Sequence, residues 1–219
     1  SEGVVFTKVA DDDKKAVIIS LNCETDFVAK SDDFINAANQ IVEAALANFP
    51  EDLASLKEQQ VDGKTINDLI TDKTGVIGEK IELGYYDRLE AESVGAYIHA
   101  DNKLAAIVGF NKPGTDAHVK KEVAMQVAAM NPAAVDKDDV PQETIDRELE
   151  LGKDQARQEG KPENILDKIA QGRLNKFFSE STLLNQESIK YSKTSVRDFL
   201  KQQDESLTVT GFKRYSLKG

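Results

Sequence analysis

The sequence predicts an α+β fold of two related subdomains, each an antiparallel sheet with a helix on one face, plus an inserted antiparallel helical hairpin. Three observations predict this. A β-rich run, a polar connector and an amphipathic helix occur in the same order twice, after about ninety residues. A highly charged region without β-rich runs follows, and a final β-rich run closes the chain. The expected parts are an N-terminal core subdomain at 1–75, a C-terminal core subdomain at 76–132 and 181–219, and the hairpin at 133–180.

The first subdomain begins with two β-rich runs, Val4–Val9 and Lys15–Leu21, separated by a polar turn, a pattern typical of a β-hairpin. Ser31 is expected to cap a helix that runs to about Ala47, because apolar residues recur there at spacings of three and four. Pro50 is expected to end that helix. Two shorter helical patterns follow, at 53–56 and 65–70.

The second copy has the same order of elements. Its β-rich runs are 85–89, 94–99 and 104–110. A polar connector, 111–115, leads into a helical pattern at 116–130 with a second apolar face. We also expect a short helix at 195–200 and a closing strand at 207–215 that completes the second sheet.

The region from Pro132 differs in character, with two narrow apolar stripes at helical spacing on either side of Gly160–Pro162. Two helices joined by so short a connection must run antiparallel. Stripes this narrow cannot support a core of their own, so each helix needs the other helix or a partner.

Composition excludes several classes of function. The chain has 219 residues and a formal net charge of −11, whereas binding a nucleic-acid backbone requires clustered Lys and Arg. It has neither an apolar run of about 18 residues, as a membrane span requires, nor a secretory peptide. Cys23 is the single cysteine, which excludes an internal disulfide and fits the reducing cytoplasm. The sequence therefore predicts a cytoplasmic protein that meets other proteins, without direct nucleic-acid or membrane binding.

The residues also argue against an enzyme. The two histidines, His99 and His118, belong to no cluster with metal-ligand spacing and to no recognisable nucleophile motif. No glycine loop of the phosphate-binding type is present. We interpret His99 as a strand-end residue and His118 as a solvent-facing residue at a helix start, and we expect no metal and no cofactor.

The connector Asn22–Lys30 is the stretch that carries most information about function. It places Asp26 and Phe27 between a strand and a helix, where rigid elements hold functional side chains. One interpretation makes Thr25 or Asp26 an N-cap and Phe27 a lid over the core. The other makes Phe27 an exposed aromatic anchor for a partner. Cys23 is interpreted as a small buried filler at the end of the strand.

This connector closely resembles the most characteristic motif of bacterial elongation factor Ts, the nucleotide exchange factor of elongation factor Tu. Further segments resemble other landmarks of that family: 75–81, 95–99, 123–132, 160–177 and 209–215. The segment 160–177 resembles the turn and second arm of the family's coiled coil. The family's N-terminal helical module, which resembles a ubiquitin-associated domain, is expected to be missing, since Ser1 enters a strand pattern at once.

The resemblance implies a guanine nucleotide exchange factor that does no covalent chemistry, binds elongation factor Tu in its GDP-bound and nucleotide-free forms, and promotes exchange of GDP for GTP. In the family, the phenylalanine of the motif wedges between helices near the magnesium site of the GTPase, and the aspartate helps to rearrange groups there. The residues to which these contacts carry over are Thr25, Asp26, Phe27 and Val28 at the motif, with Ile77, Gly78 and His99 as further contacts. The resemblance also allows a homodimer through the helical hairpin. The alternative is a non-catalytic scaffold or chaperone-like protein that binds a partner through that hairpin.

Overall fold

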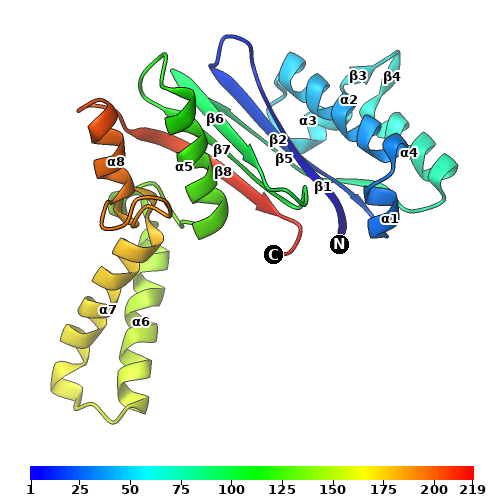
Figure 1. Ribbon diagram of the computed structural model, residues 1–219. Coiled ribbons are helices and arrows are strands. Elements are labelled where there is room, and N and C mark those ends of the chain that lie inside the picture. Colours follow the sequence, from blue (N-terminus) through cyan, green and yellow to red (C-terminus); the bar gives the residue numbers. More distant parts are fainter. The chain divides into compact units, whose positions relative to one another are not determined.

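The computed structural model describes all 219 residues and divides them into two compact units (Figure 1). The sheet unit comprises residues 1–129 and 208–219, and the helical unit comprises residues 130–207. Helices and antiparallel sheets are both present, which confirms the α+β class. None of the helices combines the length and the apolar character that a membrane crossing requires.

The first sheet has the strand order β1-β2-β5, with β1 at Glu2–Val9, β2 at Lys15–Cys23 and β5 at Glu82–Glu90. The expected hairpin is confirmed, because β1 and β2 pair antiparallel with Val5 opposite Ser20. The grouping of the third strand differs from expectation. β5 pairs with β2, with Ile19 opposite Tyr86, so this run belongs to the first sheet and not with the later strands.

The second sheet has the order β6-β7-β8, with β6 at Ser93–Ile98, β7 at Leu104–Phe110 and β8 at Val209–Ser216. The chain therefore returns from the helical unit to add β8 beside β7, and the prediction that the closing strand completes the second sheet is confirmed.

The two sheets pack face to face, and each carries a helix on its outer face. The shared core between the sheets consists of Val5, Ala16, Ile18, Val94, Ala105 and Ile107. Residues of opposite parity along β1 and β2 point to the other face, where α2 (Asp32–Asn48) buries Phe34 and Ile41 against them. Each such fully buried side chain contributes roughly 1.5–3 kcal/mol through the removal of apolar surface from water.

The helix α5 (Ala117–Met130) lies beside the second sheet (Figure 1). A glycine makes this close approach feasible. A Cβ added to Gly95 of β6 would lie only 2.9 Å from the carbonyl oxygen of Lys120 in α5. The expected arrangement of one helix on one face of each sheet is thus observed.

Short elements lie on both sides of α2 between β2 and β5. They are α1 (Asp26–Ala29), which precedes α2, and α3 (Leu53–Lys57), β3 (Gln60–Val61), β4 (Lys64–Thr65) and α4 (Ile66–Ile77), which follow it. The helix α2 ends at Asn48, its C-cap Phe49 has a left-handed φ of 47°, and Pro50 follows directly, as expected.

The helical unit contains α6 (Gln142–Gln158), α7 (Leu166–Ser181) and α8 (Val196–Gln203), with 3-10 turns at 137–139, 163–165 and 183–185. The helices α6 and α7 pack side by side and bury Ala156 and Ala170. Gly152 permits close contact, because an added Cβ would lie 3.2 Å from the Cα of Ala170. Arg173 ties α7 to α6 with hydrogen bonds to Glu159 at 2.9 and 3.0 Å.

The segment that precedes β8, up to residue 207, groups with α6 and α7 in the helical unit. Its polar anchor is Asp136, which accepts hydrogen bonds from Asn185 at 2.8 Å and Arg197 at 2.5 Å. Whether the parts are independently stable, as the three-part division implies, stays a prediction.

Candidate functional site

The expected connector contains a single helical turn. β2 ends at Cys23 and α1 occupies only Asp26–Ala29, so we call residues 24–30 the α1 turn. Thr25 is its N-cap, with its hydroxyl accepting a hydrogen bond from the Val28 amide at 3.3 Å. Ser31 lies at the N-cap position of α2 but does not cap it with its side chain. Its hydroxyl donates instead to the Val28 carbonyl at 2.7 Å, which ties the two helices together.

Phe27 points into solvent, with 86% of its surface exposed. The residues that bury the α1 turn against the first core are its neighbours Val28 and Ala29, which are 8% and 4% exposed. The interpretation of Phe27 as a lid over the core is therefore wrong, since Val28 fills that role. A large aromatic ring left this exposed on a packed turn is a feature typical of interaction sites.

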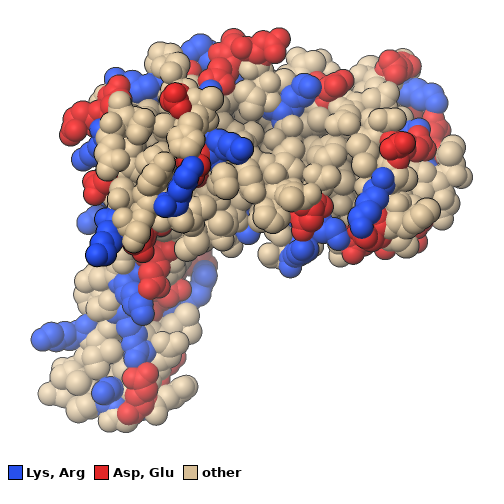
Figure 2. Space-filling view, in the orientation of Figure 1, with Lys and Arg blue, Asp and Glu red and all other residues tan.

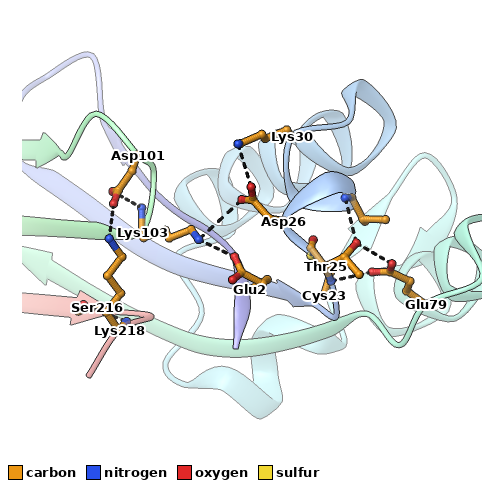
Figure 3. Close-up of polar contacts among 11 residues, drawn as sticks. Glu2, Cys23, Thr25, Asp26, Lys30, Glu79, Asp101, Lys103, Ser216 and Lys218 are labelled. Carbon is orange, nitrogen blue, oxygen red and sulfur yellow. Dashed lines mark hydrogen bonds and ion pairs between the residues drawn. The ribbon is translucent and has the colours of Figure 1, made fainter.

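Asp26 lies between two cations (Figure 3). Its carboxylate is 2.8 Å from the ammonium group of Lys30 and 3.7 Å from that of Lys103. The hydrogen bond from Lys30, followed by the charges of both lysines, holds the pKa of Asp26 below its usual value. The carboxylate is thus ionised at neutral pH and keeps its partners in the free protein.

Lys103 comes from the loop between β6 and β7 and connects the α1 turn to both sheets. Its ammonium group lies 2.5 Å from the Glu2 carboxylate at the start of β1. The carbonyl of the preceding residue, Asn102, accepts a hydrogen bond from the Val5 amide at 2.7 Å, which fixes the loop on β1. Asp101 continues this charged row by binding Lys218 at 2.8 Å, and that hydrogen bond lowers the pKa of Asp101 (Figure 3).

Glu79 holds the other side of the α1 turn (Figure 3). One carboxylate oxygen accepts the amides of Glu24 and Thr25, each at 3.1 Å, and the other accepts the Thr25 hydroxyl at 2.7 Å. In return, the Glu24 carboxylate accepts the amide of Lys80 at 3.3 Å. Sequence reasoning missed both Glu79 and Lys103. Glu79 does belong to the segment 75–81 that resembles the family, but nothing in the sequence indicates that it contacts Glu24 and Thr25.

These contacts bring the expected site residues to one region of the sheet unit. Ile77 is half-buried against the first core, and Gly78 ends α4 with a left-handed φ of 80°. They are followed by Glu79, whose carboxylate joins this segment to the α1 turn. His99 is exposed at the end of β6, with its Nδ1 3.0 Å from the Tyr97 hydroxyl. It belongs to the same β6–β7 connection as Lys103, which reaches Asp26.

Cys23 is a buried residue, as expected. Only 7% of it is exposed, and its thiol donates to the Thr25 carbonyl at 3.2 Å. Burial first, and the nearby Glu79 carboxylate second, raise the pKa of the thiol to about 11. A thiol that stays protonated at neutral pH is a poor nucleophile, so Cys23 serves the packing beneath the α1 turn.

Charges of both signs are interspersed over the face of the molecule in Figure 2, without a continuous basic surface. His118, the other histidine, is exposed at the start of α5, where its amide donates to the Asp116 carboxylate at 2.9 Å. This placement agrees with its interpretation as a surface residue.

Comparison with known proteins identifies a family over nearly the whole chain. The family model described as Elongation factor TS matches residues 24–218, a range that begins with the α1 turn. Elongation factor Ts of Christiangramia forsetii is 51% identical, over 99% of this chain and 79% of the relative. The protein of the same name from Porphyromonas gingivalis is 46% identical, over 99% of this chain and 78% of the relative. That from Azobacteroides pseudotrichonymphae is 45% identical, over 92% of this chain and 74% of the relative.

The α+β fold with its packed α1 turn and the matches along the chain define a translation factor. The chain belongs to the elongation factor Ts family, and its role lies in translation elongation.

Proposed function

We propose that this protein is a guanine nucleotide exchange factor that binds elongation factor Tu·GDP, disturbs its magnesium and phosphate site, and promotes release of GDP and its exchange for GTP. The observation that carries the proposal is the exposed Phe27 ring on the α1 turn, next to an ionised carboxylate. Family membership supports it, because both residues lie within the matched range.

Exchange of this kind follows from linkage between two binding events. If this protein binds nucleotide-free Tu more tightly than Tu·GDP, it must lower the affinity of Tu for GDP by the same ratio. No bond of the nucleotide breaks, so the protein acts without covalent chemistry. A wedge that disturbs magnesium coordination removes much of the charge compensation for the phosphates, and GDP leaves faster.

Phe27 is the proposed wedge, since its ring is free to enter a partner without unfolding any part of the core. Asp26 is proposed to act on the charged groups near the metal, after exchanging Lys30 and Lys103 for groups of the partner. Val28 is buried, so we expect it to support Phe27 from beneath. Thr25 shapes the turn through its cap. Ile77, Gly78 and His99 are proposed as further contacts around the same region.

The rival function is a scaffold or chaperone-like protein that binds its partner through α6 and α7. Leu151 and Ile165 of this hairpin are exposed, 46% and 36%, and could meet a partner or a second copy of the chain. We propose the hairpin as a secondary surface, because its two helices already bury their small residues against each other.

One assay separates the two functions. Tu loaded with a fluorescent GDP analogue is mixed with an excess of unlabelled GDP, and release is followed with and without substoichiometric amounts of the protein. An exchange factor accelerates release and turns over many times. A protein that binds Tu stably but leaves the release rate unchanged would be a scaffold, and the proposal would be overturned.

A further inference from the structure

We infer that Glu79 is a positioning residue for exchange, whose carboxylate clamps the α1 turn so that Phe27 and Asp26 reach the partner in one fixed orientation. The inference deepens the proposed function and rests on it. Its basis is the set of three hydrogen bonds that Glu79 accepts from Glu24 and Thr25. Both donors are far from Glu79 in the sequence.

The α1 turn needs such a clamp because it is too short to hold itself. A helix of four residues has one turn of internal hydrogen bonds, and helices this short are unstable in isolation. The amides that precede it have no partner within it. Thr25 supplies one cap to Val28, and Glu79 supplies the acceptors for the amides of Glu24 and Thr25 and for the Thr25 hydroxyl itself. The cap residue is thus held by Glu79.

The clamp also joins two segments that are 54 and 55 residues apart in the sequence. Glu79 reaches the chain before α1, and Glu24 reaches back to the amide of Lys80. The segment that carries Glu79 is itself fixed. Gly78 turns the chain at a φ of 80°, a conformation that favours glycine, and the Ile81 amide donates to the Thr74 hydroxyl at 3.2 Å. Hydrogen bonds in both directions therefore hold the α1 turn to the segment that contains Ile77 and Gly78.

Loss of the clamp should alter orientation more than stability. Glu24 and Thr25 are exposed, so water can replace the carboxylate at their amides. Val28 and Ala29 would still anchor the turn in the core. The chain would fold, but the base of Phe27 would sample several orientations, and a small misplacement of a reacting group can slow a reaction by up to about a hundredfold.

Three variants test the inference in the full chain. Glu79→Ala removes the acceptors. Glu79→Gln keeps one carbonyl oxygen for the two amides, and its amide group can donate to the Thr25 hydroxyl. Glu82→Ala, on the exposed face of β5, is the matched control three residues away. Each variant is measured in three ways: amide hydrogen exchange of residues 24–29 in the free protein, thermal unfolding, and GDP release from Tu as a function of factor concentration.

We expect Glu79→Ala to speed hydrogen exchange at Glu24 and Thr25 by about tenfold, which corresponds to about 1.4 kcal/mol. Its maximal rate of GDP release at saturating factor should fall about tenfold or more, while the unfolding temperature falls by only a few degrees. Glu79→Gln should keep the hydrogen-exchange rate and the maximal rate of GDP release within about threefold of the parent chain. Its hydrogen bonds to the α1 turn are weaker only because the negative charge of the carboxylate is lost. Glu82→Ala should behave like the parent chain in all three.

The outcomes separate the inference from the function on which it rests. A parent chain that accelerates GDP release, with Glu79→Ala equally fast at saturation, would overturn the positioning role and leave the exchange function standing. A fall in unfolding temperature that accounts for the whole loss, without faster hydrogen exchange confined to the α1 turn, would overturn it in favour of a structural role. A parent chain that does not accelerate release would overturn the proposed function and this inference together.

Discussion

The ammonium group of Lys103 lies 2.5 Å from the carboxylate of Glu2, and this ion pair joins the β6–β7 loop to the first strand. The side chains are only 18% and 33% exposed, so the pair is shielded better than an ordinary surface ion pair. The same ammonium group extends to Asp26 at 3.7 Å, so the α1 turn is connected to the second sheet through Lys103.

We predict a measurable coupling between Lys103 and Glu2. Lys103→Met, Glu2→Gln and the double variant should form a thermodynamic cycle with a favourable coupling energy, at the upper end of the range for exposed pairs because both side chains are partly buried. Chemical denaturation of the four proteins measures it. Single-variant effects that simply add up in the double variant would show that the pair contributes nothing.

Asp26→Asn should slow GDP release while leaving the unfolding temperature nearly unchanged, because Asp26 is half exposed and its pairs with lysine are weak. Thr25, and not Asp26, is the N-cap, so the substitution does not remove the cap. Asp26→Ala serves as the comparison. Release rates equal to the parent chain in both variants would refute a role for this carboxylate in exchange.

The single cysteine offers a test of the packing beneath the α1 turn. With its pKa raised to about 11 from 9.0, Cys23 has about a hundredfold less thiolate at pH 8 than a free thiol, and its burial slows access further. Alkylation of the folded chain should therefore be at least about a hundredfold slower than in urea, and its rate should keep rising with pH beyond pH 9, because the folded thiol loses its proton only near pH 11. Alkylation of the folded chain at the free-thiol rate would contradict this packing.

Much of the fold can be predicted from the sequence, because most elements rest on local patterns. β-rich runs predicted β1 and β2, and the three-and-four spacing predicted α2 nearly to its last residue. Strand pairing is different, because a β-rich run identifies a strand without identifying the strand it pairs with. The run 85–89 was therefore assigned to the second sheet, whereas its pairing with β2 places it in the first.

The same distinction applies to the site. The motif at residues 22–30 is continuous in the sequence and could be recognised there, but its supports come from distant positions. Glu79 and Lys103 act on the α1 turn across long loops, and a lone Glu or Lys in an acidic, charged chain carries no signal of its target. Whether Phe27 is buried or exposed depends on which side of a single helical turn faces the core. A turn this short shows no apolar periodicity in the sequence that would indicate the buried side.

The hairpin should be dispensable for the fold of the sheet unit. Replacing Pro141–Lys176 by a flexible glycine-serine linker removes α6 and most of α7, which pack against each other where Gly152 meets Ala170. We expect cooperative thermal unfolding to persist, together with measurable GDP release at saturating factor and a weaker affinity for Tu. If cooperative unfolding disappears, the hairpin belongs to the core and the expected division of the chain is wrong.

The most direct test of the central claim compares GDP release from Tu by the parent chain, by Phe27→Ala and by Val28→Ala. Phe27→Ala should slow release about thirtyfold, corresponding to about 2 kcal/mol for a lost anchor, with an unchanged unfolding temperature. Val28→Ala should lower the free energy of unfolding by about 2 kcal/mol, since it leaves a cavity beneath the turn. A Phe27→Ala protein that releases GDP as fast as the parent chain would contradict the account, because the exposed ring would then have no part in exchange.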